Sequence, residues 1–143
     1  MTPHGVLETS VYVRDLDAAE RFYAGVLGLP LVGRMEGRHV FFRCGRGVLL
    51  VFNPDVTGTE PTWVDGSVIP LHGTQGSGHV AFAIREDEIE PWRQRLAEAG
   101  VALESEVAWP GGGHSLYFRD PDGNSLELAT PRLWGLDEDA VLP

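Results

Sequence analysis

The sequence predicts an α+β protein built from two copies of a β-α-β-β-β module. Three observations support this: apolar and polar residues alternate in short runs as in strands, one amphipathic helix follows the first strand of each half, and the second half repeats the first. At 143 residues, 43% of them hydrophobic, the chain is long enough to bury a core. We expect a first module at 1–56, a linker or arm at 57–77, a second module at 78–132 and a C-terminal tail at 133–143.

The first half shows the module in order. Residues 7–13 alternate as a strand, and Asp15 is a suitable N-cap for a helix that stops at Gly28 before Pro30. Apolar residues recur at helical spacing between these two points. Three further strands are expected, at 31–32, 38–43 and 48–52.

The stretch from 54 to 78 separates the two halves. It is rich in Gly, Pro, Thr and Ser and has no stable hydrophobic period, which favours a linker. Trp63 and His72 lie within it, so part of the segment is a candidate for an arm that packs on the protein.

The second half repeats this organisation. Residues 78–84 alternate as a strand, and a helix is expected at 88–99 with Pro91 in its first turn and Gly100 as its stop. Extended segments follow at 101–103 and 106–109. The run S-L-Y-F-R-D-P-D-G-N-S-L-E-L from Ser115 then predicts a hairpin, because D-P-D-G-N supplies the residues that a tight reversal needs.

Aligning the two halves places three possible metal ligands at related positions. E-T-S-V-Y-V-R-D aligns with H-V-A-F-A-I-R-E, which equates Glu8 with His79, and the last strands equate Leu50 with Glu127. Two curved half-sheets can close around a shared cleft, so the inward faces of these strands are expected to converge there. We therefore predict that Glu8, His79 and Glu127 bind one divalent metal. Taken singly, the two glutamates are also typical of solvated strand faces and the histidine of a hydrogen-bonded core residue.

Charge and composition argue against several kinds of partner and of catalytic chemistry. The net charge of −10 and the absence of a basic run argue against nucleic acid or an anionic membrane as partner, and are compatible with a cationic ligand. With Cys44 as the single cysteine, no internal disulfide can form. The sequence has no lysine, which rules out Schiff-base and P-loop lysine chemistry. No signal peptide or membrane span is evident, and we expect a cytoplasmic protein.

Three stretches make the chain similar to the vicinal oxygen chelate superfamily of glyoxalases, bleomycin resistance proteins and extradiol dioxygenases. They are V-R-D-L-D-A-A-E-R-F-Y-A-G-V-L-G-L, G-H-V-A-F and Y-F-R-D-P-D-G-N-S-L-E-L. The resemblance implies an eight-stranded, incompletely closed cup with helices outside, usually in a homodimer. It also implies that Glu8, His79 and Glu127 stand where the family has metal ligands, whereas Leu50 stands where glyoxalases carry a further glutamate.

The resemblance implies a glyoxalase-like, metal-dependent enzyme that chelates a small oxygenated substrate and catalyses proton transfer, of isomerase, lyase or epimerase type. Glu127 or Glu8 would be the general base. One imidazole and two carboxylates suit Mn²⁺, Co²⁺, Ni²⁺, Zn²⁺ or Fe²⁺ and do not match the two-histidine triad of an extradiol dioxygenase, so that activity is a lesser alternative.

The alternation of side chains along each strand predicts a substrate cleft lined by residues of both modules, with a glycine-rich loop carrying one histidine at its mouth. These residues are Ser10, Tyr12, Leu50, Phe52, Tyr117, Arg119 and the loop residue His114. Two alternatives remain open. One is a metal-free binding protein that sequesters a cationic drug, as bleomycin resistance proteins do. The other is thiol transfer to a small epoxide antibiotic, for which Arg119 would have to help bind a phosphonate.

Overall fold

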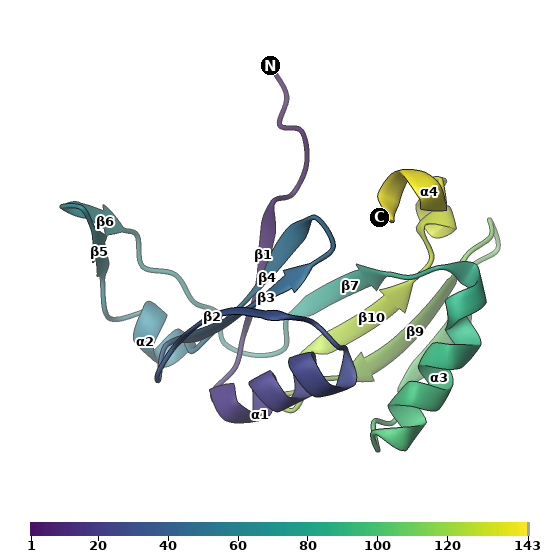
Figure 1. Ribbon diagram of the computed structural model, residues 1–143, viewed down its shortest axis with the longest axis horizontal. Coiled ribbons are helices and arrows are strands. Elements are labelled where there is room, and N and C mark those ends of the chain that lie inside the picture. Colours follow the sequence, from purple (N-terminus) through teal and green to yellow (C-terminus); the bar gives the residue numbers. More distant parts are fainter. Residues whose placement is uncertain (143) are drawn as a thin grey trace. The chain divides into compact units, whose positions relative to one another are not determined.

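A computed structural model describes residues 1–142 of the chain (Figure 1). The chain divides into two compact units, Met1–Ser77 and Gly78–Pro143, which we call unit 1 and unit 2. Each unit has its own sheet and its own buried core, and each is described separately below. No helix within residues 1–142 is long and apolar enough to cross a membrane.

Unit 1 contains one four-stranded sheet with strand order β1-β4-β3-β2. Its elements are β1 (Glu8–Tyr12), α1 (Leu16–Glu20), η1 (Arg21–Val26), β2 (Leu31–Met35), β3 (His39–Cys44) and β4 (Gly47–Phe52). Strand β1 runs parallel to β4, whereas β2, β3 and β4 pair in antiparallel fashion. The parallel pair requires a crossover, and the α1–η1 helix begins that connection.

The helix of unit 1 begins where the sequence predicts. The Asp15 side chain accepts a hydrogen bond from the backbone N–H of Ala18, so it is the N-cap. After Glu20 the helix widens into the π-helix η1, and it ends before Gly28, whose φ of 70° is left-handed. The ring of Tyr23 in η1 is fully buried and packs against the ring of Phe42 in β3, with ring centroids 5.7 Å apart.

The segment expected to be an irregular linker contains regular structure. It forms the short helix α2 (Pro54–Thr57) and a hairpin of β5 (Thr62–Val64) and β6 (Ser67–Ile69). Asp65 and Gly66 join these strands with φ values of 47° and 77°, which match the two positive φ angles of a type I′ turn. The Asp-Gly pair was therefore a readable hairpin signal within a stretch that lacks hydrophobic periodicity.

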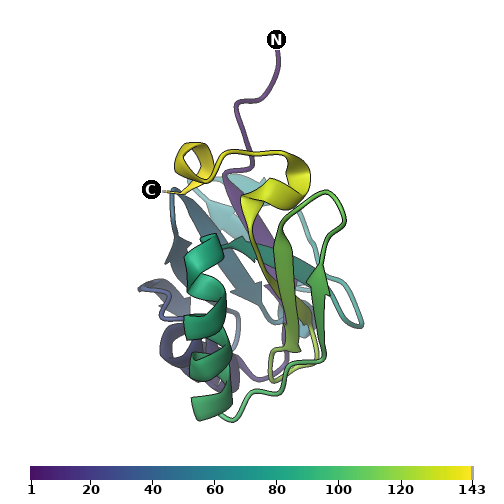
Figure 2. The same cartoon turned by 90° about the vertical axis from the view of Figure 1, so that its right-hand side faces the viewer.

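Unit 2 repeats the topology, with strand order β7-β10-β9-β8. Its elements are β7 (His79–Ala83), η2 (Glu86–Glu88), α3 (Ile89–Glu98), β8 (Ser105–Ala108), β9 (His114–Arg119), β10 (Ser125–Ala129), η3 (Pro131–Trp134) and α4 (Glu138–Val141). Helix α3 lies alongside the sheet in both views (Figures 1 and 2) and buries Ile89 and Leu96. The predicted α+β class and the duplicated β-α-β-β-β order are confirmed.

In each sheet, one face forms the core, and the opposite face carries the predicted site residues of the strands except His114. Core side chains at most 9% exposed come from alternate strand positions of both units: Val11, Val40, Phe42, Leu49, Val51, Val80, Phe82, Leu116, Phe118, Leu126 and Leu128. Because side chains alternate along a strand, the residues between them project from the other face. Glu127 and Leu50 lie on that second face, in the middle of their respective sheets.

Candidate metal and substrate site

Glu127 is a buried carboxylate in the middle of the sheet of unit 2. It lies on β10 between Ala81 of β7 and Tyr117 of β9, and is only 7% exposed. A buried carboxylate is costly unless it is paired or binds a cation. Glu127 therefore does not lie on a solvated strand face, although a single glutamate in a strand would suggest one.

His79 is one polar partner of that carboxylate. Its Nδ1 atom lies 3.0 Å from the carbonyl oxygen of Ser125, and its Nε2 atom lies 3.2 Å from Oε2 of Glu127. A carbonyl oxygen can only accept, so Nδ1 carries a proton and donates. In the neutral imidazole, Nε2 then presents a lone pair to a carboxylate oxygen. A proton or a metal ion between the two atoms is needed to make this contact favourable.

The same geometry fits a shared divalent ion. Ligand bonds of about 2.1 Å place two ligands of one ion about 3.0 to 3.4 Å apart, for octahedral and tetrahedral angles respectively. The Nε2–Oε2 distance of 3.2 Å falls in this range. The bond from Nδ1 to a backbone carbonyl is the arrangement that fixes the tautomer of metal-binding histidines. Within residues 1–142, however, no group of three His, Cys, Asp or Glu side chains that could hold a metal is present in either unit.

A chain of polar contacts continues from Glu127 across the sheet. Tyr117 shares hydrogen bonds with Glu127 and Ser115, and the indole N–H of Trp109 donates to Oγ of Ser115 at 2.8 Å. Burial, followed by the hydrogen bond to Glu127, raises the pKa of the Tyr117 phenol. The phenol therefore stays protonated and can donate to the carboxylate. His79 also stacks near Tyr117, with ring centroids 6.4 Å apart.

The β9–β10 turn holds the beginning of β7 in place next to His79. Asp120 accepts from the backbone N–H groups of Asp122 and Asn124, and the Asn124 amide donates to the second oxygen of Asp120 at 2.9 Å. The amide oxygen of Asn124 in turn accepts from the N–H of Gly78 at 2.8 Å. The D-P-D-G-N motif thus fixes the residue that precedes the imidazole.

Two further predicted cleft residues of unit 2 are engaged elsewhere. His114 begins β9 on the face opposite Glu127, and its Nδ1 lies 2.5 Å from Oε1 of Glu86. Arg119 does lie on the Glu127 face, but its guanidinium is paired with Glu104 and also donates to the carbonyl of Gly123. An arginine engaged in this way is a poor candidate for a phosphonate site.

The remaining predicted residues belong to unit 1. Glu8 is exposed at the start of β1, and Ser10 is exposed two residues later. Leu50 and Phe52 of β4 lie on the same face as these two residues and are each 8% exposed. The hydroxyl of Tyr12 lies 2.8 Å from Nδ1 of His72, a contact between residues 60 apart that no local sequence pattern reveals.

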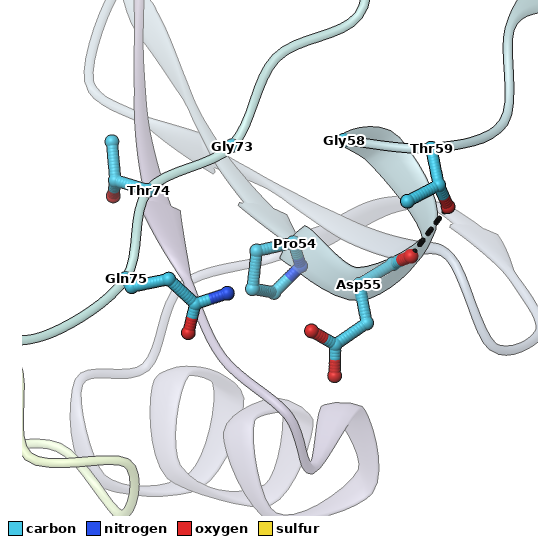
Figure 3. A pocket seen from close by; sticks show the side chains of 7 residues that line it. All are labelled: Pro54, Asp55, Gly58, Thr59, Gly73, Thr74 and Gln75. Atoms are coloured by element: carbon cyan, nitrogen blue, oxygen red, sulfur yellow. Dashed lines mark hydrogen bonds between the residues drawn. The ribbon is translucent and has the colours of Figure 1, made fainter.

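Unit 1 also has an open pocket beside α2. Its cavity volume is about 480 Å³, and it is lined by Pro54, Asp55, Gly58, Thr59, Gly73, Thr74 and Gln75 (Figure 3). Thr59 donates to the carbonyl of Asp55 at 2.7 Å, and Gln75 accepts from Arg14 at 2.9 Å. None of the predicted metal or substrate residues lines this pocket.

Comparison with known proteins identifies the family. Residues 5–128 match the model of the Glyoxalase/Bleomycin resistance protein/Dioxygenase superfamily. The chain belongs to this superfamily. The resemblance seen in the three sequence motifs is therefore confirmed.

Three proteins similar to this chain carry the names of enzymes. Glutathione transferase FosA of Serratia marcescens is 46% identical over 117 residues, which cover 81% of this chain and 73% of that protein. Metallothiol transferase FosB of Shouchella clausii is 31% identical over 137 residues, covering 91% and 82%. The crystal structure of lactoylglutathione lyase from Agrobacterium tumefaciens matches with a TM-score of 0.87 and 40% identity, covering 95% of this chain and 100% of that one.

Proposed function

We propose that the protein is a divalent-metal-dependent enzyme that moves a proton next to a metal-chelated oxygen of a small substrate. The contact that carries this proposal is the 3.2 Å approach of Nε2 of His79 to Oε2 of Glu127, in which two lone pairs face each other unless a cation joins them. Superfamily membership and the similarity to metallothiol transferase FosB support a metal in this role.

We assign His79, Glu127 and Glu8 as the metal ligands. His79 and Glu127 lie within one unit and fit a common ion, whereas Glu8 comes from unit 1. A bound divalent ion would act as a Lewis acid on a substrate oxygen, which makes an adjacent C–H bond more acidic.

The chain's own residues would then handle the proton. The carboxylate of Glu8 or Glu127 takes it from the substrate carbon and returns it to a neighbouring atom. The Tyr117 hydroxyl, protonated and bonded to Glu127, holds that carboxylate in one orientation. The carbonyl of Ser125 does the same for the imidazole. We further propose a homodimer as the working assembly.

Metal content is the decisive measurement. Untagged wild type and His79→Ala would be equilibrated with mixed divalent ions, dialysed and analysed by plasma mass spectrometry. We expect near-stoichiometric metal in the wild type and its loss in the variant. His114→Ala is the matched control, because it removes another carboxylate-paired histidine of the same unit. A folded wild type that binds no metal would refute the proposal and favour the metal-free drug-binding alternative.

Thiol transfer to an epoxide is a second candidate because of the 46% identity to a glutathione transferase. The pairing of Arg119 with Glu104 weighs against the phosphonate pocket that such a substrate needs. Metal-loaded protein would be assayed with a hemithioacetal of glutathione and, separately, with glutathione plus an epoxide phosphonate. We expect isomerisation of the first. Consumption of glutathione only with the epoxide would establish the transferase instead.

A further inference from the structure

Five rings gather on the sheet face of unit 1 that lies opposite its core. We call them the aromatic cluster: Tyr12, His39, Phe41, Phe52 and His72. Phe52 is the centre, and its ring centroid lies 4.6 Å from that of His72, 5.2 Å from Phe41, 5.9 Å from His39 and 6.2 Å from Tyr12. These are the separations at which aromatic rings attract one another.

The cluster is not packed like the core of the same unit. Tyr23 and Phe42 of the core are fully buried, whereas four members of the cluster keep part of their surface exposed around a buried Phe52. Half-exposed rings around a buried ring form a surface on which a further flat group can stack. Such a surface, with a few fixed polar groups, is typical of small-molecule sites.

His72 is the polar group that is fixed most firmly in the cluster. Its backbone N–H donates to the carbonyl of Thr57 at 3.1 Å, and its Nδ1 lies 2.8 Å from the Tyr12 hydroxyl. The next residue, Gly73, packs closely on Pro54, since a Cβ atom there would lie 3.3 Å from the Pro54 carbonyl oxygen. The connecting segment therefore holds this imidazole on the sheet at several points.

The Tyr12 contact is compatible with an imidazole proton on Nε2. Burial raises the pKa of the Tyr12 phenol, which therefore keeps its proton and can donate to Nδ1 of His72, 2.8 Å away. In that tautomer the N–H at Nε2 can donate to an oxygen atom of a ligand.

His39 brings no charge to the cluster. Burial, and then the positive charge of Arg38, lower the pKa of His39, so its ring is neutral; with Tyr12, Phe41 and Phe52 it offers rings but no charged group to pair with a charged ligand. Its Nδ1 atom is buried and has no hydrogen-bond partner among residues 1–142. An unpaired buried nitrogen is unusual in native proteins, so the polar capacity of this ring is not used up by the chain.

We propose that the aromatic cluster binds the aryl group of a neutral, oxygen-bearing substrate, with Nε2–H of His72 donating to its oxygen. This assigns a substrate class to the enzyme, and in that sense it rests on the proposed function. Binding itself requires only unit 1 residues, so it can be measured with or without metal.

Ring-proton NMR of the histidines during titration with acetophenone tests the proposal. The chain has five histidines, and single His→Asn variants assign their Cε1–H resonances. We expect the His72 and His39 resonances to shift in a saturable way. Ethylbenzene lacks the oxygen and cyclohexyl methyl ketone lacks the flat ring, and we expect each to bind about tenfold more weakly, the size of one lost hydrogen bond or stacking contact.

Two variants separate the two parts of the site. His72→Phe should weaken acetophenone about tenfold while leaving ethylbenzene unchanged, because it keeps a ring in the cluster and removes the hydrogen-bond donor. Phe41→Leu should weaken both ligands and leave the His72 resonance in place. His4→Asn, at an exposed histidine outside the cluster, is the matched control and should change nothing.

Three outcomes would overturn the proposal. They are an absence of saturable shifts with acetophenone, equal affinity of wild type and His72→Phe for it, and tighter binding of benzyltrimethylammonium, which would indicate a cation site. The metal measurement is independent of these. A protein that binds acetophenone but no metal refutes only the enzyme assignment, and one that binds metal but no aryl ketone refutes only the substrate class.

Discussion

The two units share one topology but present different chemistry on the face opposite the core. In both, the first strand pairs in parallel with the last, and the registers are equivalent: Ser10 faces Leu50 as Ala81 faces Glu127. Unit 1 carries rings and aliphatic groups on this face, whereas unit 2 carries a buried carboxylate with its partners. The duplicated backbone therefore keeps the same apolar core face in both units while the residues of the second face differ.

The divergence involves pairs of residues rather than single ones. Leu50 of β4 lies opposite Phe41 of β3, and the equivalent pair in unit 2 is Glu127 opposite Tyr117. The tyrosine differs from the phenylalanine by one hydroxyl, and that hydroxyl bonds to the carboxylate that replaces the leucine. A buried charge is tolerated only with such a partner.

The residue that follows the hairpin turn also differs between the units. In unit 1 it is Gly47, which lies so close to the residue preceding β1 that a Cβ atom would be 2.9 Å from the carbonyl oxygen of Leu7. In unit 2 the corresponding place is filled by Asn124, whose side chain bonds to Gly78. One unit thus uses the absence of a side chain, and the other a specific amide, to join the last strand to the first.

The largest expected effect concerns what the units have in common. Phe42→Ala in unit 1 and Phe118→Ala in unit 2 each remove a fully buried ring, and each should lower the free energy of unfolding by about 4 kcal/mol. Urea denaturation followed by circular dichroism measures this. Val32→Ala, at an exposed strand position, is the control and should cost less than about 0.5 kcal/mol. A large loss in only one unit would mean that the cores are not equivalent.

Transplanting the carboxylate tests what distinguishes the units. Leu50→Glu should destabilise the protein by about 3 kcal/mol, since it buries a charge opposite Phe41 without a partner. Adding Phe41→Tyr should restore about 1 kcal/mol through the new hydrogen bond. The same urea titrations, including Phe41→Tyr alone, give the coupling between the two changes. Strict additivity of the two substitutions would contradict the role given to the Tyr117 hydroxyl.

The turn contrast predicts a smaller effect. Asn124→Ala should cost about 2 kcal/mol, because it removes the hydrogen bonds that the Asn124 amide makes to the Gly78 N–H and to Asp120 in a buried turn. Asn53→Ala removes the more exposed N-cap of α2 in unit 1 and should cost about 1 kcal/mol. Hydrogen exchange at Gly78 should quicken only in the first variant. Unchanged protection there would show that Asn124 does not hold β7.

The smallest effect is a pH dependence that arises in unit 1. The pKa of His39 is lowered in the folded state, chiefly by burial, so the unfolded state binds the proton more readily. The corresponding stability is complete above pH 6.5 and is lost as the pH falls below it. His39→Leu should therefore flatten the dependence of unfolding free energy on pH between 8 and 5. An equal slope in wild type and variant would remove His39 as its source.

The sequence by itself determined the repeated strands and helices, since alternation, the Asp15 cap and the D-P-D-G-N turn are local signals. It also placed Glu8, His79 and Glu127 at related strand positions, as register follows from the period of two. Only the tertiary structure decided which side chains meet. The contact of His79 with the Ser125 carbonyl joins residues 46 apart in the sequence, and the contact of Tyr12 with His72 joins residues 60 apart. Neither these contacts nor the burial of Glu127 can be read from a local sequence pattern, because each depends on how distant segments pack.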